Sequence, residues 1–386
     1  MKALFVHGFK FFEDSRGNLY LRGYDNAIWN RYLKLFDELY VIGRKISVID
    51  MDTAGFNKFE GDKLFFIEVP DIYDAKNYLR NNIVFKNMAY KIIDDVDVII
   101  TRLPGTYSSK IINYAKKKNK PYLIELVGCP WDALWNHSIK GKLAAPYMWY
   151  STRKAVINAP YVLYVTNEFL QRRYPANGRH IGCSDVSLPL LDEEILKNRL
   201  NRIEQRSGNK PIVIGTIGAT NVRYKGQQYV IEAISYLNRQ GYDFQYQVVG
   251  GGDRSFLMSL AEKYGVSHKV KFLGSLPHEK VFEYLDNIDL YIQPSKTEGM
   301  PRALIEAMSR GCPAIGSNTG GIPELLNKEF VFKKGSVKEL CNLLKRLNKE
   351  EMQKEANRNF EKAKEYNKEL LDQKRTAFFK EFVRMV

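Results

Sequence analysis

The chain contains 386 residues, of which 45% are hydrophobic and 27% are charged, and these values are typical of a folded protein long enough for two domains. They exclude a chain that is disordered as a whole. The formal net charge of +15 calls for an anionic partner, for which nucleic acid, an anionic membrane surface and phosphorylated small molecules are the candidates.

The sequence lacks the signatures that would select nucleic acid. It contains no zinc-ligand spacing, no ribonucleoprotein signature and no single basic block. We therefore expect no nucleic-acid partner, and keep a basic nucleic-acid binder as one alternative hypothesis. The cysteines are far apart in the sequence, which predicts reduced and mostly buried thiols. They are Cys129, Cys183, Cys312 and Cys341.

In the first half of the chain, short apolar runs alternate with longer mixed segments. The first run, residues 4–6, is too short for a signal peptide, and no apolar stretch approaches the length of about 20 residues that spans a bilayer. We therefore predict a cytoplasmic location, with peripheral attachment to the inner face of the cell membrane as an option. The alternation predicts a parallel sheet with helices on both faces. Residues 9–26 are interpreted as a long loop after the first strand. The further predicted strands are 46–49, 64–69, 96–100, 122–126 and 162–165.

A charged helical stretch at 188–210 separates two regions of this kind. We predict an acceptor-side domain over 1–190, an interdomain connection over 191–210 and a second, donor-binding domain over 211–362. The last segment, 363–386, has apolar residues at helical spacing and is expected to pack on a domain. The strands predicted in the second domain are 212–218, 244–249, 270–274, 289–293 and 313–316.

The strongest local signal is the run from Pro294 to Ala307. It predicts a strand end, a glycine turn and a helix whose first residue is Pro301, so the amides around the helix start would face an anion. Glu298 and Glu306 flank this site. Because carboxylates repel phosphate, we expect them to accept hydrogen bonds from sugar or ribose hydroxyls. Alternatively, they are a solvated turn residue and an exposed helix residue paired with a nearby arginine.

Several ordered motifs of the second half resemble those of glycosyltransferase family 4, the large retaining family of GT-B fold. They are Glu298-Gly299-x-Pro301, Glu306-Ala307-Met308, Gly311-x-Pro313, Gly320-Gly321-Ile322-Pro323-Glu324, Ile214-Gly215-Thr216-Ile217-Gly218, Lys225-Gly226, Glu232-Ala233, Val248-Val249-Gly250-Gly251-Gly252 and Phe272-Leu273-Gly274. The resemblance implies an α/β architecture with two Rossmann-like, doubly wound domains that face each other across a cleft. It also implies a C-terminal helix that returns to the N-terminal domain.

The resemblance also implies roles for individual residues. Glu298 would bind hydroxyls of the donor sugar, Glu306 would hold the ribose, and Lys225 would pair with the donor diphosphate. Glu298 and Lys225 are thus the predicted catalytic residues. The arginine that the family places after the first strand is replaced by Ala219, and Arg223 is the candidate substitute. The predicted donor-binding residues are Gly218, Arg223, Leu276, Gly299, Met300, Pro301, Arg302, Ala303 and Glu306.

The first half matches the family less closely. Gly8 and Gly17 occupy the region of the family's glycine-rich loop, and a simple turn explains them equally well. Asp132 and His137 stand near the position at which many members carry a histidine. These four residues are the acceptor-side candidates, and for His137 a packing role is an equally good explanation.

The resemblance further implies a front-face retaining transfer, in which a donor phosphate oxygen takes the acceptor proton. We expect no cofactor and no metal, because Lys225, helix amides and Arg223 would neutralise the diphosphate. Asp52 and the pair Asp94-Asp95 are interpreted as caps or turns. The predicted substrates are a nucleotide diphosphate hexose or N-acetylhexosamine and a glycan or polyprenyl-pyrophosphate-linked acceptor, in cell-surface polysaccharide synthesis. A sugar-nucleotide epimerase of the same fold is the rival enzyme.

Residues 140–154 combine cations with a dense aromatic group that includes Trp149 and Tyr150. Such a mixture suits the headgroup zone of an anionic membrane, which we therefore expect as a partner surface. The alternative is an ordinary helix with a buried aromatic face.

Overall fold

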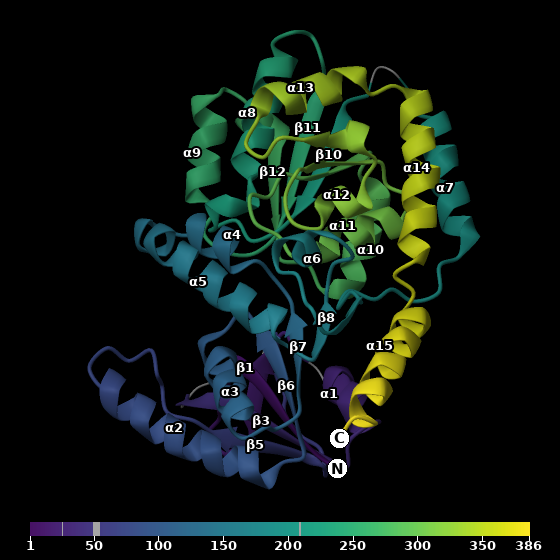
Figure 1. Cartoon of the computed structure of the whole chain (residues 1–386). Helices are drawn as coiled ribbons and strands as arrows, with labels where there is room; N and C mark the ends of the chain where they lie inside the picture. Colours follow the sequence, from purple (N-terminus) through teal and green to yellow (C-terminus); the bar gives the residue numbers. More distant parts are fainter. Residues whose placement is uncertain (25, 49–54, 208–209) are drawn as a thin grey trace.

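A computed structural model describes residues 1–24, 26–48, 55–207 and 210–386, and it shows two α/β lobes, one above the other (Figure 1). Asp52 lies outside the described residues. The N-terminal lobe is built on a nine-stranded sheet. Within it, the parallel strands run in the order β5, β3, β1, β6, β7, β8, β9. The strands are β1 (Lys2–Glu13), β2 (Leu19–Arg22), β3 (Glu38–Ser47), β4 (Phe56–Lys58), β5 (Leu64–Glu68), β6 (Val98–Leu103), β7 (Tyr122–Leu126), β8 (Tyr161–Tyr164) and β9 (Arg179–Gly182).

Helices cover both faces of this sheet because its central strands are apolar on both sides. Helices α2, α3 and α5 bury residues against one face, and α1 and α15 bury residues against the other. The N-terminal helices are α1 (Asn26–Leu33), α2 (Tyr78–Asp95), α3 (Thr106–Lys117), α4 (Pro130–Trp135), α5 (Ile139–Ile157) and α6 (Phe169–Arg173).

The expected loop at 9–26 is wrong for most of its length. Strand β1 continues to Glu13 and forms an antiparallel hairpin with β2. The physical reason is that buried and exposed side chains alternate along this segment, as in a strand. Phe9 and Phe11 are buried in the core, while Lys10 between them is exposed. Gly17 lies in the hairpin turn with a φ of 79°, a conformation that favours glycine.

The second lobe is a six-stranded parallel sheet in the order β12, β11, β10, β13, β14, β15. Its strands are β10 (Ile212–Ile217), β11 (Phe244–Val249), β12 (Val270–Gly274), β13 (Leu290–Gln293), β14 (Ala314–Ser317) and β15 (Val331–Phe332). Its helices are α7 (Glu193–Glu204), η1 (Arg223–Lys225), α8 (Gln227–Asn238), α9 (Ser255–Lys263), η2 (Ser267–Lys269), α10 (His278–Asn287), α11 (Arg302–Ser309), α12 (Ile322–Leu325), η3 (Lys328–Phe330), α13 (Val337–Arg346) and α14 (Lys349–Lys364). The two doubly wound lobes confirm the fold class expected from the sequence.

The C-terminal helix α15 (Lys368–Val383) returns to the N-terminal lobe, as expected (Figure 1). The ring of Tyr161 on β8 lies 5.5 Å from that of Phe378 and 5.3 Å from that of Phe382. Tyr32 on α1 meets Phe379 at 5.8 Å. These aromatic contacts join the end of the chain to the first lobe. Within the described residues, no helix is both long enough and apolar enough to span a bilayer.

Candidate functional site

The central pair of the site is Lys225 and Glu298. Lys225 ends the short helix η1 after β10, and Glu298 stands in the loop after β13, so two neighbouring parallel strands bring them together at their carboxyl ends. Lys225 Nζ lies 2.7 Å from Glu298 Oε1, and the side chains are 24% and 12% exposed. Gly226 allows this approach, because its φ is 82° and a Cβ there would lie 2.0 Å from the Pro294 carbonyl oxygen.

A buried polar relay, formed by β13 and the residues that directly follow it, holds the Glu298 carboxylate. Gln293 Nε2 and Ser295 Oγ donate to Glu298 Oε1 over 3.1 and 2.7 Å. Tyr291 Oη donates in turn to Gln293 Oε1 over 2.8 Å. Gln293, Ser295 and Lys225 therefore converge on Oε1, which leaves the acceptor capacity of Oε2 for another group. The sequence reasoning missed this relay, although polar residues at alternate positions of a buried strand were a usable signal.

Glu306 lies near the same point, one helix turn inside α11. Burial raises the pKa of this carboxyl, and His278 Nε2 lies 3.2 Å from its Oε1. The alternative of an exposed Glu306 is wrong, because this residue is 5% exposed. Of its two neighbouring arginines, Arg310 pairs with Asp286 at 2.7 Å, whereas the charge of Arg302 lowers the pKa of Glu306. Burial raises the pKa of Tyr291, and the charges of both Glu298 and Glu306 raise it further, so both carboxylates act electrostatically on the same phenol.

Helix α11 begins one residue later than expected. Pro301 is its N-cap, with a φ of −77° and ψ of 104°, and Arg302 is its first helical residue. Arg302 is exposed and Ala303 is half-buried, while Pro301 is buried. Met300 packs against the cores of both lobes.

The remaining donor-side candidates lie in different environments. Gly218 follows β10, and a Cβ placed there would lie 3.4 Å from Lys225 Cδ. Leu276 packs against the core of its lobe. Arg223 points elsewhere, because its guanidinium lies 4.2 Å from the centroid of the Phe256 ring.

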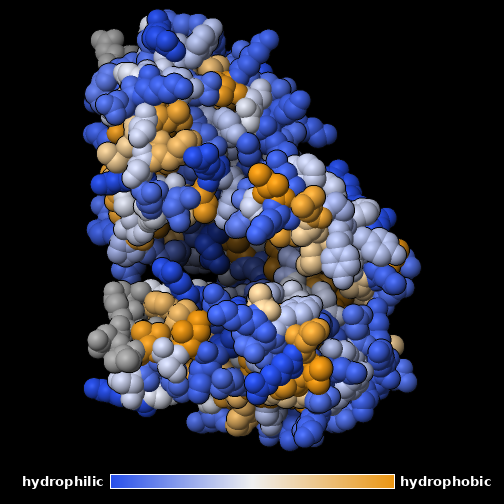
Figure 2. Space-filling model, turned by 90° about the vertical axis from the view of Figure 1, so that its left-hand side faces the viewer, coloured by the Kyte–Doolittle hydropathy of each residue, from blue (hydrophilic) through white to orange (hydrophobic). Residues whose placement is uncertain are grey.

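The loop that carries Glu298 also touches the N-terminal lobe. Thr297 Oγ1 donates to the carbonyl oxygen of Asp132 over 3.0 Å, and Asn136 Nδ2 lies 2.9 Å from Thr297 Oγ1. A Cβ on Gly299 would lie 2.7 Å from the Val127 carbonyl oxygen, so glycine permits the approach. Figure 2 shows a hollow between the lobes.

A second contact between the lobes is made by Glu324 on α12. Its carboxylate accepts hydrogen bonds from the backbone N–H groups of Asn167, Glu168 and Phe169 over 2.7, 3.1 and 2.6 Å. These amides form the start of α6 in the other lobe. A carboxylate at a helix N-terminus is stabilising, so this contact holds the lobes together.

The acceptor-side candidates do not form one cluster. Asp132 is 5% exposed and its Oδ2 lies 3.0 Å from Arg173 Nη1. His137 follows α4 and lines a cavity between the lobes. Gly8 lies in β1 at the register shift between Val6 and Phe9, and Gly17 stands in the hairpin turn described above.

Comparison with known proteins assigns the family. Residues 198–366 match the glycosyl transferases group 1 family. The chain is 36% identical over 350 residues to the CapJ protein of Staphylococcus aureus, a match that covers 90% of this chain and 86% of CapJ. The chain belongs to the glycosyl transferases group 1 family.

Other relatives of this glycosyltransferase agree with the assignment. It is 36% identical over 181 residues to the amylovoran biosynthesis glycosyltransferase AmsK of Erwinia amylovora, a match that covers 44% of each chain. Sucrose-phosphate synthase from Thermosynechococcus elongatus superposes with a TM-score of 0.66 at 16% identity, over 100% of this chain and 99% of that one. HepE from Anabaena, solved in complex with UDP, superposes with a TM-score of 0.66 at 15% identity, over 99% and 100%. The solved structures establish the GT-B fold.

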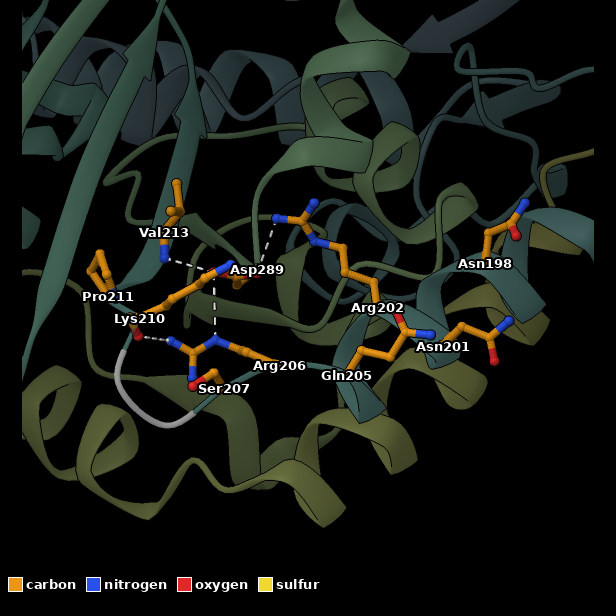
Figure 3. Close-up of a pocket in the computed structure, with 10 residues that line it drawn as sticks. All are labelled: Asn198, Asn201, Arg202, Gln205, Arg206, Ser207, Lys210, Pro211, Val213 and Asp289. Atoms are coloured by element: carbon orange, nitrogen blue, oxygen red, sulfur yellow. Dashed lines mark hydrogen bonds and ion pairs between the residues drawn. The ribbon is translucent and has the colours of Figure 1, made fainter.

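The glycosyltransferase has a further cavity, of about 670 Å³, beside helix α7, which lies in the predicted interdomain connection (Figure 3). Its arginines are already bonded by the protein: Arg202 and Arg206 lie 3.2 and 3.7 Å from Asp289. Asp289 also accepts the backbone N–H of Val213 over 2.9 Å. This arrangement ties the connection to the first strand of the second lobe, and we assign no ligand to it.

Proposed function

We propose that the enzyme is a retaining, metal-independent member of glycosyltransferase family 4. It transfers a hexose or N-acetylhexosamine from a nucleotide diphosphate sugar to a glycan or a polyprenyl-pyrophosphate-linked acceptor. The observation that carries this proposal is the pairing of Lys225 with Glu298 at 2.7 Å. The charges of Glu298 and Glu306 both raise the pKa of Tyr291, which supports a shared site.

The donor takes its place by exchanging partners with these side chains. The diphosphate replaces Glu298 as the anion that Lys225 neutralises, and Glu298 then accepts a sugar hydroxyl. Glu306, held beside His278, accepts hydroxyls of the ribose. The complex of HepE from Anabaena with UDP-glucose, a protein of the same fold, supports a nucleotide-sugar donor.

The transfer requires the protein mainly to position the substrates and to stabilise charge. The bond between the anomeric carbon and the donor phosphate oxygen breaks, and the acceptor oxygen bonds to the same face of the sugar. The leaving phosphate takes the proton of the acceptor hydroxyl. Lys225 and the amides at the start of α11 stabilise the negative charge that develops on the leaving group, so the proposed mechanism uses no metal ion.

The relatives and α5 support the proposed cellular process and membrane attachment. AmsK is named for amylovoran biosynthesis, which supports a role in cell-surface polysaccharide synthesis. On α5, Tyr150 is 59% exposed, whereas Trp149 packs against the core under Arg153. We propose that the exposed side of α5 attaches the enzyme peripherally to an anionic membrane on the cytoplasmic side, through Tyr150 and its exposed neighbours rather than Trp149.

The test combines donor binding with turnover. A panel of nucleotide sugars is screened by thermal shift, and release of nucleotide is then measured with and without candidate acceptors, in the presence of a chelator. Glu298→Gln is expected to lower turnover at least about 100-fold while nucleotide affinity stays near wild type. Glu283→Gln is the matched control, because Glu283 is exposed and pairs with Lys280.

Three results would refute the proposal in separate parts. Near-normal turnover of Glu298→Gln removes that residue from its role, and loss of activity in chelator removes metal independence. An inverted anomeric configuration of the product, read by NMR, removes the retaining mechanism. Conversion of the donor sugar without an acceptor would instead identify an epimerase.

A further inference from the structure

A cavity of about 620 Å³ lies between the lobes, next to the residues assigned to the donor. The end of α4 and the start of α5 line it from the N-terminal lobe, and η1, α8 and α9 line it from the other lobe. Lys225, Glu298 and Glu306 do not belong to its lining. Tyr224 connects the two places, because it lines the cavity and its ring centroid lies 6.0 Å from Lys225 Nζ.

Three cations of this cavity lie over aromatic rings. Arg223 is 4.2 Å from the centroid of Phe256, Lys296 Nζ is 5.0 Å from that of Tyr229, and Lys142 Nζ is 5.9 Å from that of Trp135. All six residues line the cavity. The rings hold the cations in place without neutralising them.

The positive charge of the cavity is not compensated. Within the described residues, no aspartate or glutamate belongs to the lining, and Arg223, Lys296 and Lys142 form no ion pair with a carboxylate. Uncompensated cations that converge on one cavity attract an anion. Since two of the three are lysines and the third is an arginine, phosphate oxygens are suitable partners.

An exposed apolar stripe begins at the rim of this cavity. Ile139, Leu143, Tyr147 and Tyr150 follow each other at helical spacing on α5 and are 79%, 80%, 71% and 59% exposed. The opposite side of α5 is also apolar, because Ala145 and Val156 are fully buried. Ile139 belongs both to the stripe and to the cavity lining. The apolar stripe and the cationic cavity therefore form one continuous surface.

We infer that this cavity binds the phosphate groups of a lipid-linked acceptor, whose hydrocarbon lies beside the apolar stripe of α5. The inference rests on the proposed function, since it selects the lipid-linked acceptor of the two proposed there and assigns its site. Phosphate would lie among Lys142, Arg223 and Lys296, which directs the attached sugar toward Lys225 and Glu298 past Tyr224. The complementarity is that of an amphiphile: an anionic head in the cavity and an apolar tail on the stripe.

The experiment measures binding of three probes to the full chain by isothermal titration calorimetry. The probes are farnesyl pyrophosphate, farnesol and inorganic pyrophosphate. Wild-type protein is expected to bind farnesyl pyrophosphate at least about tenfold more tightly than either of the others, because only this probe occupies both parts of the surface. The double variant Lys142→Gln, Lys296→Gln should weaken farnesyl pyrophosphate at least about tenfold. The double variant Lys86→Gln, Lys117→Gln removes the same charge from exposed positions of α2 and α3 and should leave binding unchanged.

The results separate this inference from the proposed function. Equal binding of farnesyl pyrophosphate to wild type and to the Lys142, Lys296 variant overturns the site, as does no binding to wild type at about 1 mM. Equal affinities for inorganic pyrophosphate and farnesyl pyrophosphate overturn the lipid part. Leu143→Ser, a second test at an exposed position that folding does not require, should lower the advantage of farnesyl pyrophosphate over pyrophosphate. Nucleotide-sugar binding by the wild type tests the proposed function by itself, whatever the prenyl probes do.

Discussion

The contact of Glu324 with the start of α6 predicts how firmly the two lobes are held together. Glu324→Ala removes the acceptor of three backbone N–H groups in the other lobe. A hydrogen bond to a charged acceptor contributes more than about 1 kcal/mol when it is buried. Water replaces part of this contribution at a partly exposed place, so we expect a total of about 2 kcal/mol for the three bonds. This corresponds to a shift of about 30-fold from closed toward open lobes.

Small-angle X-ray scattering measures this shift directly. The Glu324→Ala variant should show a larger radius of gyration than wild type, and Glu324→Gln, which keeps one oxygen acceptor, should lie between the two. Glu329→Ala is the control, because Glu329 is exposed and its ion pair with Arg346 is long, at 3.9 Å. Superimposable scattering curves for wild type and Glu324→Ala would show that the other contacts between the lobes suffice, and the reasoning would be wrong.

Three further perturbations test other parts of the structure. Gly320→Ala should lower the thermal midpoint of unfolding by several degrees, because the φ of Gly320 is 58° and a Cβ there would lie 2.2 Å from the Glu298 carbonyl oxygen. Gly241 also has a positive φ but no close neighbour, so Gly241→Ala should lower the midpoint less. Phe378→Ala should lower the free energy of unfolding, measured with urea, by about 3 kcal/mol, because the substitution opens a cavity under α15. A decrease below about 1 kcal/mol would contradict this packing. Burial lowers the pKa of His7 to about 4, so the unfolded chain binds the proton more readily than the folded one. As the pH falls from about 6.5 to about 4, the free energy of unfolding of wild type should therefore decrease by up to about 3 kcal/mol relative to that of His7→Gln. Parallel pH profiles of the two proteins would contradict this expectation.

Much of the donor side could be predicted because it depends on local sequence. The order of strands and helices in the second lobe follows from alternation of apolar runs, and parallel strands bring their carboxyl ends to one edge. Lys225 and Glu298, 73 positions apart, therefore meet at 2.7 Å. The helix start at Arg302 was misplaced by one residue, an error that is normal because helix ends depend on cap geometry.

Other features were hidden because their signal lies in contacts between distant segments. Strand β1 continues past Gly8 because Phe9 and Phe11 pack in a core that also contains residues of α1 and β3. His278 could not be connected with Glu306 by spacing alone, since they belong to different helices. Arg223 could be proposed for the donor phosphates, yet its side chain lies over Phe256 of α9.

The sequence by itself determined the alternation of strands and helices, the presence of a helix after Glu298 and the cationic character of the chain, because each depends on neighbouring residues. Only the tertiary structure decided that Glu324 joins the lobes and that the cations of α5, η1 and the Glu298 loop surround one cavity. The reason is physical: a residue type specifies what a side chain can bind, but packing of segments that are far apart in the chain selects which partner lies within reach.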